Sequence, residues 1–309
     1  MTTLIFPGQG SQYVNMARDF FDNFSIARET LELIEDTTKI KLKEIIFENP
    51  SDLLNQTEFT QISIFACSIS IYKVLESEIN VEDLRISTML GHSLGEYSAL
   101  TAAGFLKIQD CSNLLKIRGK LMQNAYEPNK SGMAAVIGLD CNAVDKIILN
   151  NSLDVEIAND NSPQQIVISG KIDDINRSEE FFKKFGAKRF LKLNVSAAFH
   201  SNLMKIAQNQ LIEHINKIDL NNSKISIISN FKGDISKDNY EIINNLKNQM
   251  SNRVRWVESI RKLESIKEKN IIEIGPGKVL SGLVKRISNN FNIKNIEVVS
   301  DLEKINNAI

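Results

Sequence analysis

One segment of the sequence restricts the possible folds more than any other. Gly91-His92-Ser93-Leu94-Gly95 lies between an apolar, β-prone run at 86–90 and a helix-prone run at 96–103. This pattern predicts a strand that turns sharply into a helix, with glycine on both sides of Ser93 because side chains there would collide with neighbouring elements. Free N–H groups and the dipole at such a helix N-terminus favour negative charge. Ser93 is therefore a candidate nucleophile; the alternative is an ordinary serine in a turn of small residues.

A serine nucleophile needs a base, and the sequence holds three histidines. His92 adjoins Ser93, and adjacent side chains on a turn usually diverge, so we expect it to line the site. His214 falls in the amphipathic pattern of 202–218, which is typical of a surface or half-buried helix histidine. His200 follows a β-like run at 189–195 and three small residues that leave space beside it. Elimination favours His200 as the base.

Most of the remaining chain alternates between strand and helix patterns. Strands are predicted at 3–6, 87–90, 224–229 and 271–274, and helices over much of 14–79 and at 111–125, 240–250 and 279–288. This alternation is typical of an α/β fold with a parallel sheet. We predict an α/β-hydrolase-like core formed by residues 1–128 and 196–309.

The stretch between these two parts has a different pattern. Strands are predicted at 133–138 and 189–195, helices at 141–150 and 173–185, and a hairpin of 155–159 and 165–169 around Asn161-Ser162-Pro163. The order β-α-β-β-α-β is typical of a ferredoxin-like unit, so we predict an inserted ferredoxin-like subdomain at 129–195. Since His200 follows this insert and Ser93 precedes it, the active cleft should lie between the two parts.

Composition and charge exclude several classes of function. A net charge of −1 gives no overall field that would attract nucleic acid or a membrane. The three cysteines are scattered and form neither a metal-ligand nor a disulfide pattern, which favours a reducing, cytoplasmic compartment. No run approaches 18 apolar residues, and the chain opens on a predicted strand rather than a leader peptide. We expect a cytoplasmic protein without a metal site, with no nucleic-acid or membrane partner.

Six short motifs, in order, indicate a known family. They are Gly8-Gln9-Gly10-Ser11-Gln12, the segment 91–97, Arg118, Ala198-Phe199-His200-Ser201, Asn252-Arg253-Val254-Arg255-Trp256 and Glu273-Ile274-Gly275-Pro276-Gly277. Each motif alone is weak evidence. Their order and spacing over nearly the whole chain resemble the malonyl-CoA:acyl-carrier-protein transacylases, the acyltransferases of fatty-acid and polyketide synthesis.

The resemblance implies a reaction and a set of roles. Malonyl would pass from malonyl-CoA to the phosphopantetheine thiol of acyl carrier protein through an ester on Ser93, by ping-pong kinetics and without a bound cofactor. His200 would move the proton. The backbone N–H groups of Gln9 and Leu94 would stabilise the oxyanion, and the backbone carbonyl of Gln249 would orient His200. The partners would be malonyl-CoA and acyl carrier protein, and we expect a monomer.

The resemblance also implies how the substrate is selected. Arg118, in a helix with an apolar face, would hold the malonyl carboxylate with its planar guanidinium, although an arginine there could equally be a surface charge. Phe199 resembles the malonyl-type signature next to the base. The remaining residues expected to line the pocket are His92, Met122, Gln61, Asn161 and Ser162.

Three alternatives remain open from the sequence. The same turn could serve a thioesterase or esterase, a related acyltransferase could load another acyl unit in polyketide synthesis, or an acyltransferase-like scaffold could only bind partners. The presence of Ser93, His200 and Arg118 together argues against the scaffold. The basic residues Lys188, Arg189 and Lys192 could meet the carrier protein or simply form a solvated surface.

Overall fold

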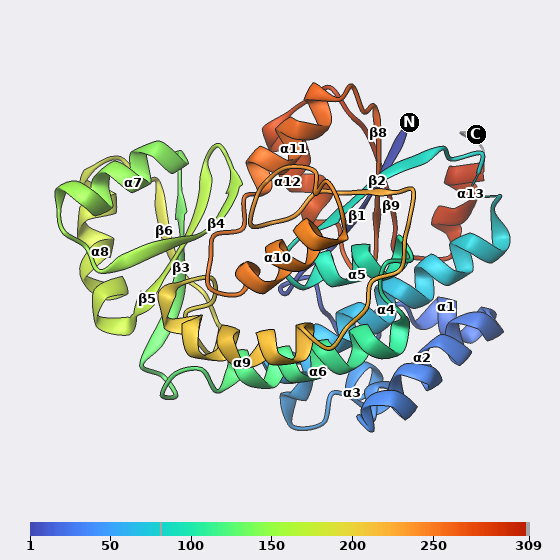
Figure 1. The fold of residues 1–309 in the computed structure, drawn as a ribbon. Coiled ribbons are helices and arrows are strands. Elements are labelled where there is room, and N and C mark those ends of the chain that lie inside the picture. Colours follow the sequence, from blue (N-terminus) through green and yellow to red (C-terminus); the bar gives the residue numbers. More distant parts are fainter. Residues whose placement is uncertain (81, 307–309) are drawn as a thin grey trace.

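Two sheets stand side by side in the computed structural model, which describes residues 1–80 and 82–306 (Figure 1). The first sheet is parallel, with the strand order β7-β2-β1-β8-β9. Its strands are β1 (Thr2–Phe6), β2 (Ile86–Gly91), β7 (Ser226–Ile227), β8 (Asn270–Ile274) and β9 (Asn292–Ile296). The central strand β1 is buried along its whole length, as expected for a parallel sheet covered on both faces.

Alternation along the strands divides the core of this sheet in two. Leu4 and Phe6 face one cluster of helices, whereas Ile5 between them faces the other. The first group includes α1 (Arg18–Asn23), α2 (Ser25–Thr38), α3 (Leu42–Phe47), the 3₁₀ helix η1 (Pro50–Asn55), α4 (Thr57–Glu78), α5 (Leu94–Ala102) and α6 (Ile108–Gln123). The second is α11 (Trp256–Ser265) and α12 (Val279–Ile287). Helix α4 is buried nearly all round, so it forms the centre of the larger cluster.

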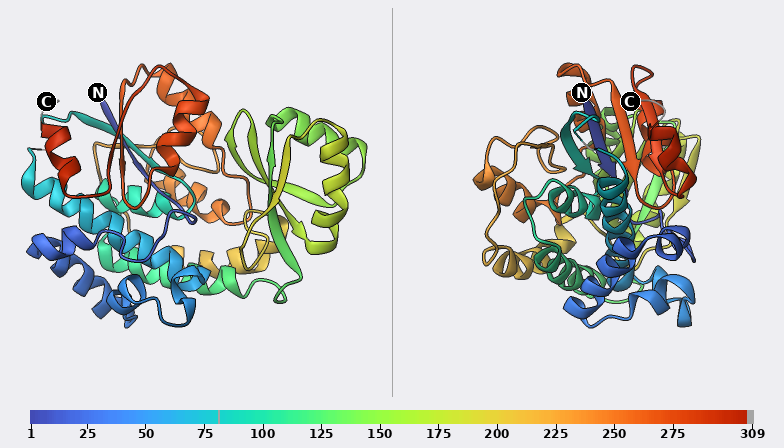
Figure 2. Two further views of the ribbon diagram at one scale, coloured as in Figure 1. Left: turned by 180° about the vertical axis from the view of Figure 1, so that it is seen from behind. Right: turned by 90° about the vertical axis from the view of Figure 1, so that its right-hand side faces the viewer.

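The second sheet is antiparallel, with the strand order β4-β5-β3-β6. Its strands are β3 (Ser131–Ile137), β4 (Val155–Ser162), β5 (Gln165–Lys171) and β6 (Arg189–Lys192). Helices α7 (Cys141–Asn150) and α8 (Ile172–Lys184) cover its outer face, as the view from behind shows (Figure 2). Met133 and Ala135 of β3 instead join the large core on the inner face.

The remaining helices follow the second sheet along the chain. They are η2 (Asn202–Met204), α9 (Lys205–Ile215), α10 (Asn239–Gln249) and α13 (Ser300–Asn306). The predicted mixed α/β architecture, a parallel sheet together with an antiparallel one, is confirmed. The β-α-β-β-α-β order between β3 and β6 is also observed, while the limits of the insert at 129–195 stay a prediction. In the described part of the chain, none of the helices has the length and apolar character needed to cross a bilayer.

Several local predictions were wrong. Asn161 and Ser162 belong to β4 rather than to the hairpin turn. The polar end of β4 is extended because it is paired on both sides. Asp160 and Ser162 pair with Ile166 and Gln165 of β5, and on the other side Asp160 N donates to Val254 O at 3.0 Å while Val254 N donates to Ala158 O at 2.8 Å. Strand β9 was missed because its sequence, NIKNI, has the polar composition of an edge strand. Helix α11 was also missed, and β6 ends at Lys192 rather than Val195.

Candidate active site

The turn at Ser93 joins β2 to α5, and its backbone is strained. Ser93 has φ 54° and ψ −107°, a conformation that non-glycine residues rarely adopt. A Cβ on Gly91 would lie 2.0 Å from the backbone of Gly95, and a Cβ on Gly95 would lie 2.1 Å from Phe6 O. Both glycines are therefore required for the close approach of β1, β2 and α5. This is the strand–turn–helix arrangement that the sequence predicted.

His200 lies against the hydroxyl of Ser93. Its Nε2 is 2.8 Å from Ser93 Oγ, and its Nδ1 faces two backbone carbonyls, Gln249 O at 3.0 Å and Asn252 O at 3.1 Å. Carbonyl oxygens only accept hydrogen bonds, so the proton of the neutral ring belongs on Nδ1 and Nε2 is free to accept from Ser93. His200 itself has φ 56°, so both members of the pair sit in strained backbone.

Arg118 reaches the same hydroxyl from α6. Its Nη2 donates to Ser93 Oγ at 3.0 Å and to Gln249 Oε1 at 2.8 Å, and its Nη1 donates to Gln61 Oε1. The residue is only 1% exposed, and its guanidinium lies 5.2 Å from the ring centre of Tyr97. Arg118 Nε is buried and has no hydrogen-bond partner among the described residues. A buried guanidinium with a free donor is suited to an anionic group.

A buried polar network lies behind these three groups. Gln249 Nε2 donates to Ser93 O at 2.9 Å and to Glu96 Oε2 at 2.6 Å. Glu96 also accepts from the backbone N–H of Asn230 at 3.2 Å, and the side chain of Asn230 contacts the Ser93 turn. In its ionised form, Glu96 places a negative charge near Arg118, which favours the charged guanidinium.

Burial and charge shift the titration of this network. Burial and the nearby Arg118 charge lower the pKa of His200 to about 3, so the ring stays neutral and able to accept a proton near neutral pH. Burial raises the pKa of Glu96 to about 7, opposed by hydrogen bonds from Gln249 and Asn230 and by the Arg118 charge. Burial also lowers the pKa of His92, against its hydrogen bond to Asn161.

Two backbone donors beside Ser93 remain free. Among the described residues, neither Gln9 N–H nor Leu94 N–H donates a hydrogen bond within the protein. The side chain of Gln9 is fixed by donation to Thr57 Oγ1 at 3.1 Å. Both residues line the cavity at Ser93, so their N–H groups are available to oxygen that becomes negative there.

A cavity of about 100 Å³ adjoins Ser93. It collects most of the residues that the sequence singled out, namely Gln9, Gln61, His92, Ser93, Leu94, Arg118, Met122, Phe199 and His200. Asn161 does not line it; instead, its Oδ1 accepts from His92 Nε2 at 2.8 Å and fixes that ring. Gln249 also lies behind the cavity rather than in its wall.

Sequence reasoning missed other residues of the site. Met133, Asn159, Leu193 and Val195 form much of the wall on the side of the second sheet. Glu96 and Asn230 complete the network beneath Ser93. Asn230 could have been found, because it follows β7, and side chains that follow neighbouring parallel strands meet at one edge of a sheet. Over residues 1–80 and 82–306, no group of three or more His, Cys, Asp or Glu side chains is placed to hold a metal ion.

This combination of fold and site defines an acyltransferase, and a family model described as "Acyl transferase domain" matches residues 3–308. A malonyl CoA-acyl carrier protein transacylase of Bacillus subtilis (strain 168) is 38% identical over 309 residues, with 99% of this chain and 95% of that protein covered. The chain belongs to the malonyl CoA-acyl carrier protein transacylase family.

Solved structures agree with this family. The acyl-carrier-protein S-malonyltransferase of Bartonella henselae superposes with a TM-score of 0.94 at 36% identity, covering 99% of this chain and 98% of that one. A malonyl-transacylase in complex with its type II PKS acyl-carrier protein gives a TM-score of 0.93 at 32% identity, covering 100% and 99%.

Proposed function

We propose that the protein transfers malonyl from malonyl-CoA to the phosphopantetheine thiol of acyl carrier protein through a malonyl ester on Ser93. One observation carries this proposal: Ser93 Oγ lies 2.8 Å from His200 Nε2 and 3.0 Å from Arg118 Nη2. A base and an anion-binding group therefore meet at one hydroxyl. The relatives described above carry the same activity in their names.

The first half-reaction forms the malonyl-enzyme. Ser93 Oγ attacks the thioester carbonyl while its proton moves to His200 Nε2. Gln9 N–H and Leu94 N–H stabilise the oxyanion of the tetrahedral intermediate. The C–S bond then breaks, and His200 returns the proton to the sulfur of coenzyme A. Gln249 O and Asn252 O hold the ring in the required tautomer throughout.

The second half-reaction reverses these roles. The thiol of the carrier's phosphopantetheine arm gives its proton to His200, and its sulfur attacks the ester carbonyl. The C–O bond to Ser93 breaks, and Ser93 Oγ recovers the proton. Because both half-reactions use one site in turn, the kinetics should be ping-pong.

Arg118 selects the malonyl group by binding its carboxylate. The charge of Arg118 is the second largest cause of the low His200 pKa, after burial. A bound carboxylate offsets that charge, so a malonyl substrate strengthens the base while an acetyl substrate does not. The other pocket residues proposed for acyl binding are Phe199, Met122, Gln61 and His92.

We expect a cytoplasmic monomer that uses no bound cofactor and has no nucleic-acid or membrane partner. Its three cysteines are all free in the structure, which is compatible with a reducing compartment. The core at 1–128 and 196–309 and the ferredoxin-like insert at 129–195 are proposed as its two folding units.

Intact-mass measurement tests the function directly. Malonyl-CoA alone should add one malonyl group to the protein, at the peptide that contains Ser93. Holo acyl carrier protein should then remove the group and gain the same mass. Release of free malonate with the carrier present would instead indicate a thioesterase, and no acylation of the wild-type protein would contradict the proposal.

A further inference from the structure

A short hairpin covers the Ser93 turn from the side of β7. It spans residues 228–236 and is closed by pairing between Ile228 and Ile235 and by donation from Gly233 N to Ser229 O at 2.8 Å. Asn230, in the first half of this hairpin, is 1% exposed. The hairpin therefore places one buried amide side chain against the catalytic turn.

Asn230 holds the turn at two points. Its Oδ1 accepts from Ser93 N at 2.6 Å, and its Nδ2 donates to Gly91 O at 2.7 Å. These two backbone groups lie on either side of His92, where β2 ends and α5 begins. A carbonyl at the end of the strand and an N–H at the start of the helix both need partners, and one amide supplies them.

The backbone of Asn230 is itself fixed by two other elements. Its N–H donates to Glu96 Oε2 at 3.2 Å, and its carbonyl accepts from Arg255 N at 3.0 Å. Glu96 in turn accepts from Gln249 Nε2 at 2.6 Å, and Gln249 O holds His200. Asn230 therefore connects the turn that carries the nucleophile to the residue that orients the base.

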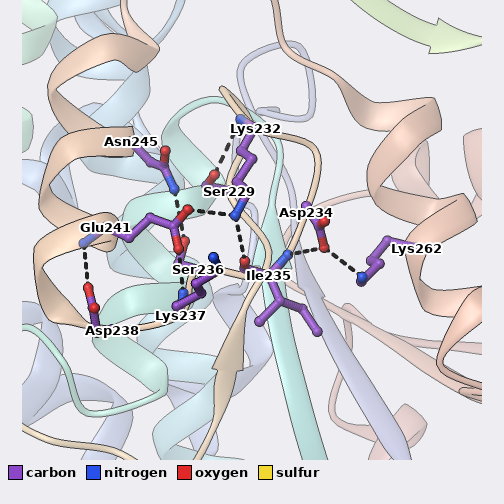
Figure 3. Close-up of polar contacts among 10 residues, drawn as sticks. All are labelled: Ser229, Lys232, Asp234, Ile235, Ser236, Lys237, Asp238, Glu241, Asn245 and Lys262. Atoms are coloured by element: carbon purple, nitrogen blue, oxygen red, sulfur yellow. Dashed lines mark hydrogen bonds and ion pairs between the residues drawn. The ribbon is translucent and has the colours of Figure 1, made fainter.

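The hairpin is braced on both flanks (Figure 3). Lys232 Nζ pairs with Glu241 Oε1 at 2.5 Å, and Asn245 Nδ2 donates to Ser236 Oγ at 3.0 Å; both contacts tie it to α10. On the other flank, Lys262 Nζ of α11 pairs with Asp234 Oδ1 at 2.8 Å. Because these contacts limit the movement of the hairpin, Asn230 can oppose relaxation of the strained turn.

We propose that Asn230 is a positioning residue for the reaction at Ser93: its side-chain amide keeps the turn in the conformation that presents Oγ to His200. The inference rests on the proposed role of Ser93. The side-chain amide of Asn230 hydrogen-bonds to backbone groups only, and Asn230 does not line the cavity, so the amide should affect the rate of attack rather than substrate binding.

Asn245 provides a matched control. It is also a buried amide, 3% exposed, and it lies in the same brace, but it donates to Ser236 Oγ rather than to the turn. The test variants are Asn230→Ala and Asn230→Asp. The control variants carry the same changes at the other position: Asn245→Ala and Asn245→Asp. Aspartate has the shape of asparagine and keeps an acceptor for Ser93 N–H, but it loses the donor to Gly91 O.

Two rates are measured, together with the melting temperature. The first is labelling of Ser93 by a fluorophosphonate probe, which needs the nucleophile and base but no malonyl recognition. The second is single-turnover acylation by malonyl-CoA, with kcat and KM from the steady state. Asn230→Ala should lower both rates about 100-fold and leave KM within about three-fold, the pattern of a misplaced reacting group. Asn230→Asp should lower them about ten-fold, because one of two hydrogen bonds is lost. Both Asn245 variants should keep near wild-type rates at a similar loss of stability, because the pairs Lys232–Glu241 and Lys262–Asp234 still hold the hairpin.

Probe rates of Asn230→Ala near wild type would overturn the proposal. So would an equal loss in the Asn245 variants, because the effect would then be one of stability alone. If Asn230→Ala does not fold, the comparison of Asn230→Asp with Asn245→Asp decides by the same criteria. If the wild type reacts with the probe but not with malonyl-CoA, the proposed function fails, and the probe rates still test Asn230.

Discussion

The two sheet regions of this protein contribute different things to one site. The parallel-sheet region supplies the polar groups: Ser93 after β2, Arg118 on α6 and Gln249 at the end of α10. The antiparallel sheet contributes mainly residues that line the cavity, such as Met133 of β3 and Asn159 of β4. His200 lies just beyond the point where the chain returns from one region to the other.

The difference reflects what each kind of sheet edge offers. Parallel strands end together, so Ser93 after β2 and Asn230 after β7 meet. With Glu96 of α5 and Gln249 of α10 they form a buried network of hydrogen bonds. The antiparallel sheet instead presents a face of alternate side chains to the cavity. Changes to the hydrogen-bonded network around Ser93 and His200 should therefore alter the rate of reaction, and a change at Arg118 should alter the choice of acyl group. Changes on the side of the antiparallel sheet should alter only substrate binding. The following predictions test this division.

Loss of the base should have the largest effect. We expect His200→Ala to lower the rates of both half-reactions by roughly 10²–10⁴-fold, the usual contribution of a general acid–base residue. His214→Ala, a change at the end of α9, should leave them near wild type. Rapid-quench measurements of the rate of malonyl-enzyme formation and of the rate of transfer to the carrier protein check both variants. Near-normal acylation by the His200 variant would move the base elsewhere.

Loss of Arg118 should change selectivity. Hydrogen bonds to charged groups contribute about 1.5–3 kcal/mol, so Arg118→Ala should reduce the preference for malonyl-CoA over acetyl-CoA by roughly ten- to a hundred-fold. Arg118→Lys should recover only part of it, because lysine keeps the charge but not the planar pair of donors. The measurement is kcat/KM for both substrates. An equal loss for both would assign Arg118 a structural role.

The buried carboxyl of Glu96 should make stability depend on pH. Its pKa is raised from 4.5 to about 7, so between these values the folded protein binds more protons at this site than the unfolded chain. Its contribution to stability therefore falls as pH rises through this window. The free energy of unfolding of the wild type, relative to Glu96→Gln, should decrease by up to about 3 kcal/mol from pH 4.5 to pH 7.

Urea unfolding of both proteins at several pH values measures this difference. His200, whose lowered pKa gives the opposite slope, is present in both proteins and cancels. If the difference in unfolding free energy between the two proteins does not change with pH, then burial does not raise the pKa of Glu96.

Truncating an apolar side chain in the cavity wall on the side of the antiparallel sheet should have the smallest effect on the kinetics. Leu193, 37% exposed, lines the cavity just after β6, whereas Leu191, within β6, does not. Leu193→Ala should raise KM for malonyl-CoA about three-fold through lost apolar contact and leave kcat unchanged. Leu191→Ala should alter neither. A fall in kcat for Leu193→Ala alone would break the proposed division between the two regions.

The sequence predicted the elements whose signals are local. The glycines at 91 and 95 predicted the sharp turn at Ser93. The structure shows why glycine is needed there: a Cβ at either position would lie about 2 Å from backbone atoms. Periodicity likewise predicted the order β-α-β-β-α-β at the second sheet. It failed at β9 and at the end of β4, because these segments are held by backbone pairing, β9 with β8 and the end of β4 with β5 and Val254, rather than by an apolar pattern of their own.

The candidate site divides in the same way. By itself, the sequence determined which residues have the chemistry: a serine between glycines and a histidine after small residues, with Arg118, Gln9 and Gln249 added by resemblance to a family. Only the tertiary structure decided which groups meet and how they titrate. Asn230, 137 residues from Ser93 along the chain, reaches it because β7 lies beside β2. The neutrality of His200 follows from burial and from the charge of Arg118. Contacts and burial of this kind depend on the packing of distant segments, which no local pattern encodes.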